Sequence, residues 1–158
     1  DGLFSYAKKE KMLEIMKDSR IGTNGTVVLI LYFITKITII SEIITINPKY
    51  LIIFPIIARL STSVNAGLSD YARKSGMSNA IISENGIFEV IFSLILTNAL
   101  VFLIIGTKGG IALFIALLFI ILFMLNVRKK IGGITGDTMG ASLELTSILV
   151  LFLGIVLR

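Results

Sequence analysis

Two glycine-rich segments each carry carboxylates, and this combination is suited to binding phosphate through a metal ion. Residues 16–25 (MKDSRIGTNG) contain Asp18, and residues 132–144 (GGITGDTMGASLE) contain Asp137 and Glu144. Glycines let backbone amides approach a phosphate closely, and a nearby carboxylate can hold the Mg²⁺ that bridges it. Both segments are therefore candidate substrate sites, and their carboxylates are candidate ligands or catalytic groups.

The second segment also has simpler interpretations. Gly132, Gly136 and Gly140 repeat every four residues, a spacing that lets helices pack closely in a membrane. Asp137 at a helix start could serve as an N-cap. Glu144 lies inside an apolar stretch, where an ionisable group is costly unless it faces a partner or a cavity. Packing and ligand binding are compatible, and both stay open.

Basic residues could supply the anion-binding part of such a site. Arg59 follows Pro55 in a short apolar stretch, and we expect it to point inward to an anion or an acidic partner. Arg73 and Lys74 are topology signals by default, yet their loop opens on the same predicted membrane face as both glycine-rich segments. Together these groups form an electropositive mouth around acidic metal-ligand candidates.

Five apolar stretches must position these residues. Each is long enough, or nearly so, to cross a bilayer core of roughly 30 Å. They are residues 27–46, 50–64, 87–105, 111–127 and 139–157. Residues 50–64 form the shortest stretch, which could be tilted, kinked or half-inserted. Lys36 and Glu42 are six positions apart in the first stretch, so we do not expect them to pair.

Lys and Arg fall on alternate connections. Ten lie in the segment before the first stretch, in the loop 65–86 and directly after residue 127, whereas the other connections and the C-terminus hold three. Short cytoplasmic loops collect cations, so the N-terminus is predicted to be cytoplasmic and the C-terminus external. This assignment of sides requires residues 50–64 to cross the membrane.

Composition favours a membrane protein. The 158 residues are 55% hydrophobic, with a net charge of +5 and a mean hydropathy of +0.94, too apolar for a soluble domain of this length. The cations flank the apolar stretches, so anionic lipid is the expected partner and nucleic acid is not. Cys and His are absent, which excludes disulfides, thiolate or imidazole chemistry, and metal ligation by those residues.

These observations predict an all-α, polytopic integral membrane bundle of about five transmembrane helices. An amphipathic surface helix is expected over residues 5–20, with its apolar side toward lipid or the bundle. We treat the chain as one membrane domain, with a cytoplasmic motif segment over 1–25 and the bundle over 26–158. The chain starts with Asp1 and shows no signal-peptide pattern, so we expect it to be the C-terminal portion of a longer protein.

Four of these segments together resemble the cobalamin synthase family, adenosylcobinamide-GDP ribazoletransferase. They are residues 13–25 (LEIMKDSRIGTNG), the short stretch with Pro55 and Arg59, residues 71–76 (YARKSG) and residues 132–144. Their order and spacing match over essentially the whole chain. Asp1 and Gly2 resemble the last two residues of the acidic motif that precedes the basic surface helix in that family.

The resemblance implies a multi-pass enzyme of the bacterial or archaeal cytoplasmic membrane that acts late in cobalamin synthesis. A hydroxyl of α-ribazole, or of its 5′-phosphate, would attack adenosylcobinamide-GDP in a Mg²⁺-dependent phosphotransfer that releases GMP. Phosphoryl transfer needs positioning and charge neutralisation, so the lack of His and Cys is no obstacle. Further partners to consider are a second copy of the chain and other corrin-pathway membrane enzymes.

Roles follow for the matching residues. Asp1, Asp18 and Asp137 are expected to bind or position the metal. Glu144 could orient a ligand or the attacking hydroxyl. These four residues form the expected catalytic set. Contacts to the diphosphate are expected from three cations: Arg20, Arg59 and Arg73. A backbone cradle is expected from the two junctions: Gly22, Gly25, Gly132, Gly133, Thr135 and Gly136.

Other readings remain. A lipid phosphotransferase of the CDP-alcohol type also uses membrane-embedded aspartates, but its expected spacing is absent after Asp1, where Gly2 is followed by Leu3, Phe4 and Ser5. A transporter or channel would place its important polar groups near mid-membrane, along a path such as Arg59, Glu89 and Glu144. A membrane assembly subunit would use every glycine for packing.

Overall fold

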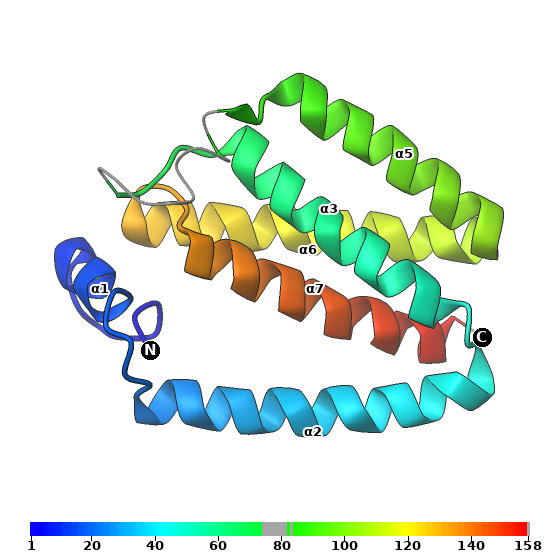
Figure 1. Ribbon diagram of the computed structural model, residues 1–158, viewed down its shortest axis with the longest axis horizontal. Helices are drawn as coiled ribbons and strands as arrows, with labels where there is room; N and C mark the ends of the chain where they lie inside the picture. Colours follow the sequence, from blue (N-terminus) through cyan, green and yellow to red (C-terminus); the bar gives the residue numbers. More distant parts are fainter. Residues whose placement is uncertain (74–81, 83, 158) are drawn as a thin grey trace.

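The computed structural model describes residues 1–73, 82 and 84–157, and within them the protein is all-helical (Figure 1). Its helices are α1 (Lys9–Ile15), α2 (Thr23–Ile46), α3 (Tyr50–Leu68), α5 (Ile87–Ile105), α6 (Thr107–Ile131) and α7 (Gly136–Val156). All except α1 are long and apolar enough to cross a membrane. The predicted five-helix membrane bundle is thus confirmed by length and composition.

Residues 50–64 belong to a helix that is long and apolar enough to cross a membrane. α3 continues beyond residue 64 to Leu68, has 19 residues, and contains Pro55 in its interior. It runs from one end of the bundle to the other (Figure 1). The charge alternation depends on this crossing, so the helical arrangement agrees with it.

Two glycines define the limits of α6. Gly106 has φ 76° between α5 and α6, and Gly132 has φ 75° in the left-handed region directly after Ile131. A glycine in this conformation ends a helix without the steric cost that a Cβ would add. α6 is therefore longer at both ends than the apolar run 111–127 from which it was predicted.

The surface helix is shorter than predicted. We expected residues 5–20, but α1 covers only Lys9–Ile15. The chain before it turns back on itself, because the Ser5 amide donates to the carbonyl of Asp1 at 3.0 Å and the Ser5 hydroxyl donates to the carbonyl of Gly2 at 2.7 Å. The apolar face of this region packs against the bundle through the following side chains: Leu3, Met12, Leu13 and Met16.

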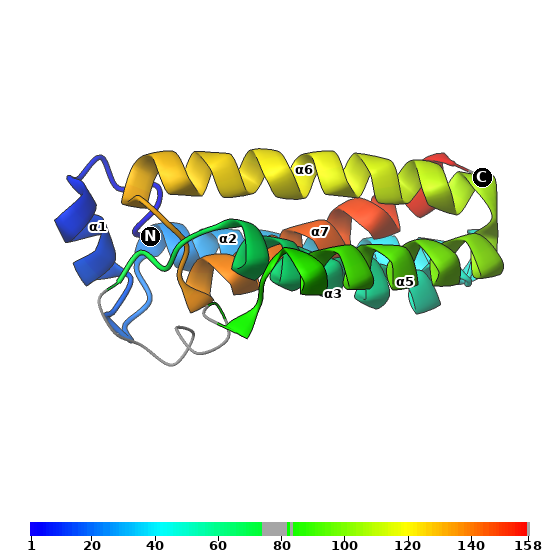
Figure 2. The same ribbon diagram turned by 90° about the horizontal axis from the view of Figure 1, so that it is seen from above.

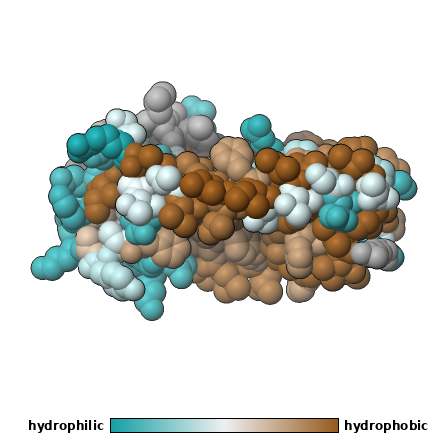
Figure 3. Space-filling view, turned by 90° about the horizontal axis from the view of Figure 1, so that it is seen from below, coloured by the Kyte–Doolittle hydropathy of each residue, from teal (hydrophilic) through white to brown (hydrophobic). Residues whose placement is uncertain are grey.

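The segments expected on one membrane face do gather at one end of the bundle. The starts of α2, α5 and α7 and the ends of α3 and α6 all point toward the end of the bundle where α1 lies, although α5 begins and α3 ends farther from α1 (Figures 1 and 2). The same end is hydrophilic in the space-filling view, whereas apolar side chains cover the length of the helices (Figure 3). The side of the membrane that this end faces stays a prediction.

The last helix occupies the centre of the bundle, where it contacts α2, α3 and α6. Gly154 permits a close approach, since a Cβ there would lie 2.6 Å from Cγ of Tyr50. Nearer the hydrophilic end the core becomes polar: the side-chain amide of the buried Asn65 donates to Ser142 Oγ at 3.0 Å. Small and polar residues at helix contacts are typical of membrane bundles.

Candidate active site

A short backbone bridge connects two distant segments at the hydrophilic end. The Ala72 amide donates to the Ile134 carbonyl at 2.8 Å, and the Ile134 amide donates to the Asp70 carbonyl at 2.9 Å. Gly133 is necessary for this contact, because a Cβ there would lie 2.5 Å from the Asp70 carbonyl oxygen. The bridge fixes the segment before Arg73 against the segment before α7.

This bridge brings Arg73 next to Asp137, two residues that the sequence analysis placed at the same membrane face without pairing them. Arg73 Nη2 lies 3.0 Å from Asp137 Oδ2. The Arg73 side chain is 16% exposed and that of Asp137 is 58% exposed, and Arg73 Nε is buried without a hydrogen-bond partner among the described residues. A largely buried guanidinium with spare donors beside an accessible carboxylate can bind an anion while the carboxylate stays open to a second ligand.

The start of α7 is held in place by a side-chain cap. Thr135 is the N-cap, and its hydroxyl accepts a hydrogen bond from the Thr138 amide at 3.3 Å. The Thr138 hydroxyl interacts in return with the backbone of Thr135. Thr135 therefore caps the helix, and Asp137 lies in its first turn with its side chain available, so the N-cap interpretation of Asp137 is wrong.

The glycines of this junction do different things. Gly132 ends α6, and a Cβ on it would meet the Nζ of Lys9 at 2.5 Å. Gly133 permits the backbone bridge described above. A Cβ on Gly140 would meet no other described residue within 4 Å, so among these residues the four-residue glycine repeat does not form a helix-packing surface at that position.

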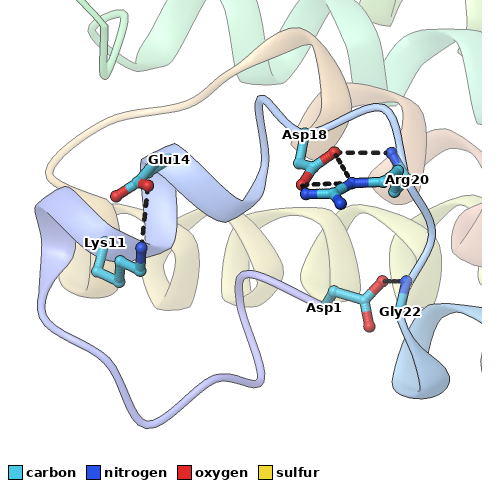
Figure 4. Close-up of polar contacts among 6 residues, drawn as sticks. All are labelled: Asp1, Lys11, Glu14, Asp18, Arg20 and Gly22. Carbon is cyan, nitrogen blue, oxygen red and sulfur yellow. Dashed lines mark hydrogen bonds and ion pairs between the residues drawn. The ribbon is translucent and has the colours of Figure 1, made fainter.

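The first glycine-rich segment forms a cradle that binds Asp1 (Figure 4). The Gly22 amide donates to Asp1 Oδ2, and the Gly25 amide donates to Asp1 Oδ1, each at 2.8 Å. A Cβ on Gly25 would lie 2.4 Å from Asp1 Oδ2. In the structure these amides bind a carboxylate of the protein itself at the N-terminus of α2, where the helix dipole favours negative charge. Their predicted role as a cradle for the substrate stays a prediction.

Asp18 and Arg20 pair with each other. Arg20 Nη2 lies 2.7 Å from Asp18 Oδ2, and the Arg20 amide donates to Asp18 Oδ1 at 3.0 Å (Figure 4). Hydrogen bonds from the Arg20 side chain, and then from its backbone, lower the pKa of the Asp18 carboxyl, and the carboxylate raises the pKa of Arg20. Both side chains are accessible to solvent, so other ligands can reach them.

The three predicted metal ligands are thus held by three different partners. Asp1 binds backbone amides, Asp18 binds Arg20, and Asp137 binds Arg73. Within residues 1–73, 82 and 84–157, no three carboxylates come together as a cluster that could hold a metal ion. The donor set fits an ion that is bound through one or two carboxylates, with substrate phosphates and water as its other ligands, which is the usual arrangement for Mg²⁺.

Arg59 lies apart from the Arg73–Asp137 pair. It lines a pocket of about 460 Å³ with Thr62, Ser63, Ala66, Glu84 and Asn85. A second pocket shares Ala66 and Asn85 with the first and continues along the end of α3 to Tyr71, close in sequence to Arg73. Arg59 therefore faces polar space that extends toward the site end of the bundle.

Glu144 has partners that the sequence reading missed. Lys36 Nζ lies 2.9 Å from Glu144 Oε2, and the Tyr32 hydroxyl bonds to both groups. Seven residues separate Asp137 from Glu144, which places Glu144 about 10 Å farther along α7. From the sequence, we considered Glu42, in the same helix, as the possible partner of Lys36. The available signal was that both Lys36 and Glu144 are charged residues inside apolar stretches.

Comparisons with known proteins agree with this arrangement of motifs. The family model described as cobalamin-5-phosphate synthase matches residues 1–156. A relative from Clostridium novyi named adenosylcobinamide-GDP ribazoletransferase is 37% identical over 94% of this chain and 60% of its own length. Relatives with the same name from Fusobacterium nucleatum (37% identical, 99% of this chain, 65% of the relative) and Clostridium acetobutylicum (39%, 92%, 58%) are similar.

The chain spans about three fifths of the length of these curated relatives. No solved structure matches it. The family model nevertheless covers nearly every residue, including both glycine-rich junctions and all five long helices. The chain belongs to the cobalamin-5-phosphate synthase family.

Proposed function

We propose that this chain forms the larger part of an adenosylcobinamide-GDP ribazoletransferase in a bacterial or archaeal cytoplasmic membrane. The support is its family membership together with relatives of that name. The charge alternation favours a cytoplasmic location for the end with α1. Nucleotide-linked substrates would then reach the site from the compartment that supplies them.

The reaction would replace the phosphoanhydride bond of a diphosphate by a new phosphate ester bond. A hydroxyl of α-ribazole, or of α-ribazole 5′-phosphate, attacks the phosphorus that carries cobinamide. A new P–O bond forms, the P–O bond of the diphosphate breaks, and GMP leaves with the bridging oxygen. The hydroxyl proton passes to a base or to water. The products are adenosylcobalamin, or its 5′-phosphate, and GMP.

Residues at the hydrophilic end suit these steps. Arg73, whose buried Nε has no hydrogen-bond partner among the described residues, would bind a diphosphate oxygen and neutralise charge as GMP leaves. Asp137 would hold Mg²⁺, with Asp18 and Asp1 as further candidate ligands. The ion supplies charge neutralisation at the diphosphate when bound. Arg20 and Arg59 are candidate diphosphate contacts, and Glu144 is a candidate for orienting a ligand.

The observation that carries this proposal is the Arg73–Asp137 pair. It joins a cation and an accessible carboxylate from two segments 64 residues apart, both of which belong to the motifs that mark the family. The backbone bridge and the Thr135 cap hold the two groups rigidly. Rigid, preformed charges are what catalysis by positioning requires.

The test uses the full-length enzyme in liposomes and measures GMP release from adenosylcobinamide-GDP and α-ribazole. We expect release to require Mg²⁺ and to fall at least about 100-fold in Asp137→Asn, since one preorganised charge is typically worth that much. Glu42→Gln, which changes an exposed carboxylate in the far half of α2, serves as the control. Normal turnover and unchanged Mg²⁺ dependence in Asp137→Asn would show that the assignment of Asp137 is wrong.

A further inference from the structure

The first half of α2 has very little attachment to the rest of the bundle. Among residues 23–38, all of which the structure describes, every residue is exposed except Gly25, Tyr32 and Lys36. The buried apolar residues of this helix, Ile39 and Ile43, both belong to its second half. Apolar packing against the bundle therefore holds the far half of α2, whereas only a few contacts hold the near half.

Gly22 and Gly25 bind Asp1 at the very start of this half. Among the described residues, its hydrogen bonds and ion pairs to other helices meet at one point. The ammonium of Lys36 lies 2.9 Å from Glu144 Oε2 on α7, and the Tyr32 hydroxyl bonds to both groups. The same ammonium lies 5.0 Å from the ring centroid of Tyr32 and 5.8 Å from that of Phe54 on α3. Three helices thus surround one cation.

We infer that Tyr32, Lys36 and Glu144 form a polar clasp that sets the position of the near half of α2 relative to α7. Charged groups in an apolar environment are costly unless they are paired, so the pair resists separation. The Phe54 ring attracts the Lys36 ammonium and so links α2 to α3, while the Tyr32 ring attracts it within α2. In a helix with so few other contacts, this cluster decides where the helix begins.

The beginning of α2 is part of the candidate site. Gly22 and Gly25 hold the Asp1 carboxylate there, and the Arg73–Asp137 pair lies at the start of α7. The clasp therefore acts on the relative position of these two groups. Its three members are positioning residues, acting at a distance of about two helical turns from Asp137.

The first experiment measures distances between spin labels in the full-length protein in liposomes, by pulsed electron paramagnetic resonance. The described chain contains no Cys, so only Cys residues in the rest of the full-length protein need replacement. Val28→Cys with Gly140→Cys reports on the near half of α2, because Val28 is 53% exposed and Gly140 has open space. Ile44→Cys with Phe152→Cys reports on the far half, where both side chains are also exposed.

In Lys36→Met and in Glu144→Gln, we expect the near-half distances to broaden and shift to longer values. The far-half distances should stay unchanged, which also confirms that the variants are folded. Thr38→Val is the matched control, because among the described residues the Thr38 hydroxyl bonds only to the Ile34 carbonyl of the same helix. Unchanged near-half distances in Lys36→Met would overturn the inference, since other contacts would then hold α2.

Two further variants guard against loss of folding. Tyr32→Phe removes one hydroxyl and adds no charge, so it should shift the near-half distances in the same direction by less. If Lys36→Met does not insert, an unchanged near-half distribution in Tyr32→Phe overturns the inference. The exchanged pair Lys36→Glu with Glu144→Lys restores opposite charges and should recover the original distances, and failure to do so in a folded protein counts against the clasp.

A second readout, GMP release, rests on the proposed function. Positioning predicts that release falls in Lys36→Met and recovers in the exchanged pair, following the near-half distances. If the protein releases no GMP at all while the distances change as expected, the proposed function fails and the clasp stands. If release is normal in a variant with displaced α2, the clasp does not position the site.

Discussion

Alanine at Gly133 should loosen the contact on which the candidate site depends. A Cβ there would lie 2.5 Å from the Asp70 carbonyl oxygen and 2.9 Å from the Ala72 amide nitrogen. Both neighbours are backbone atoms, so relief requires the two segments to separate by roughly 1 Å, to ordinary van der Waals distance. The two hydrogen bonds of the bridge weaken, and at about 1 kcal/mol each the free energy of unfolding falls by about 1–3 kcal/mol.

The same displacement reaches Arg73, which follows Ala72 in the chain. A shift approaching 1 Å in a positioned group can cost on the order of 100-fold in rate, so we expect GMP release by the full-length enzyme to fall about 10- to 100-fold. Unfolding in detergent gives the stability change. Gly140→Ala is the matched control: it adds a methyl group in open space within α7 and should stabilise by about 0.5–1 kcal/mol. If the two variants behave alike, the bridge does not need a glycine.

Three further outcomes are expected. Arg20→Gln should raise the pKa of Asp18 toward its ordinary value, which NMR titration of the carboxyl measures. In the unchanged protein, the Asp18–Arg20 pair is fully formed above the ordinary carboxyl pKa and is lost as the pH falls through the lowered pKa of Asp18. Thr135→Ala should lower the free energy of unfolding by about 1 kcal/mol through loss of the cap, whereas Thr135→Ser should not. Gly154→Ala should destabilise by about 1–3 kcal/mol, because the new methyl group meets the Tyr50 ring at 2.6 Å; thermal unfolding in detergent measures both.

The membrane fold could be predicted from the sequence because it depends on local composition. Runs of apolar residues fix which segments are transmembrane helices, and the alternating cations fix which connections share an end. The exact ends of the helices were harder to predict. α6 ends at Ile131, directly before the left-handed Gly132, and α3 ends at Leu68, directly before the extended Ser69. Hydropathy does not record such changes of backbone conformation. α1 was overestimated because its amphipathic pattern continues into residues that form turns.

Partners across helices could not be predicted, because they depend on packing between residues far apart in the chain. The Lys36–Glu144 pair joins residues 108 apart, and no periodicity within either helix indicates it. The prediction came closer for Arg73 and Asp137, because both residues were placed at the same membrane face. The metal-ligand assignments for Asp1, Asp18 and Asp137 stay predictions.

The central position of α7 has a consequence for how the protein is made. Asn65 on α3 donates its buried amide to Ser142 on α7, and 77 residues separate them. At a synthesis rate of 5–20 residues per second, roughly 4–15 s pass before that partner emerges from the ribosome. During this interval the Asn65 amide keeps its hydrogen bond to the Ser61 carbonyl of α3, but its second N–H lacks a partner within an apolar span. The nascent chain would depend on insertion factors or neighbouring helices to shield that N–H. Ribosomes that stall before α7 would therefore leave a product that the cell's membrane proteases can recognise.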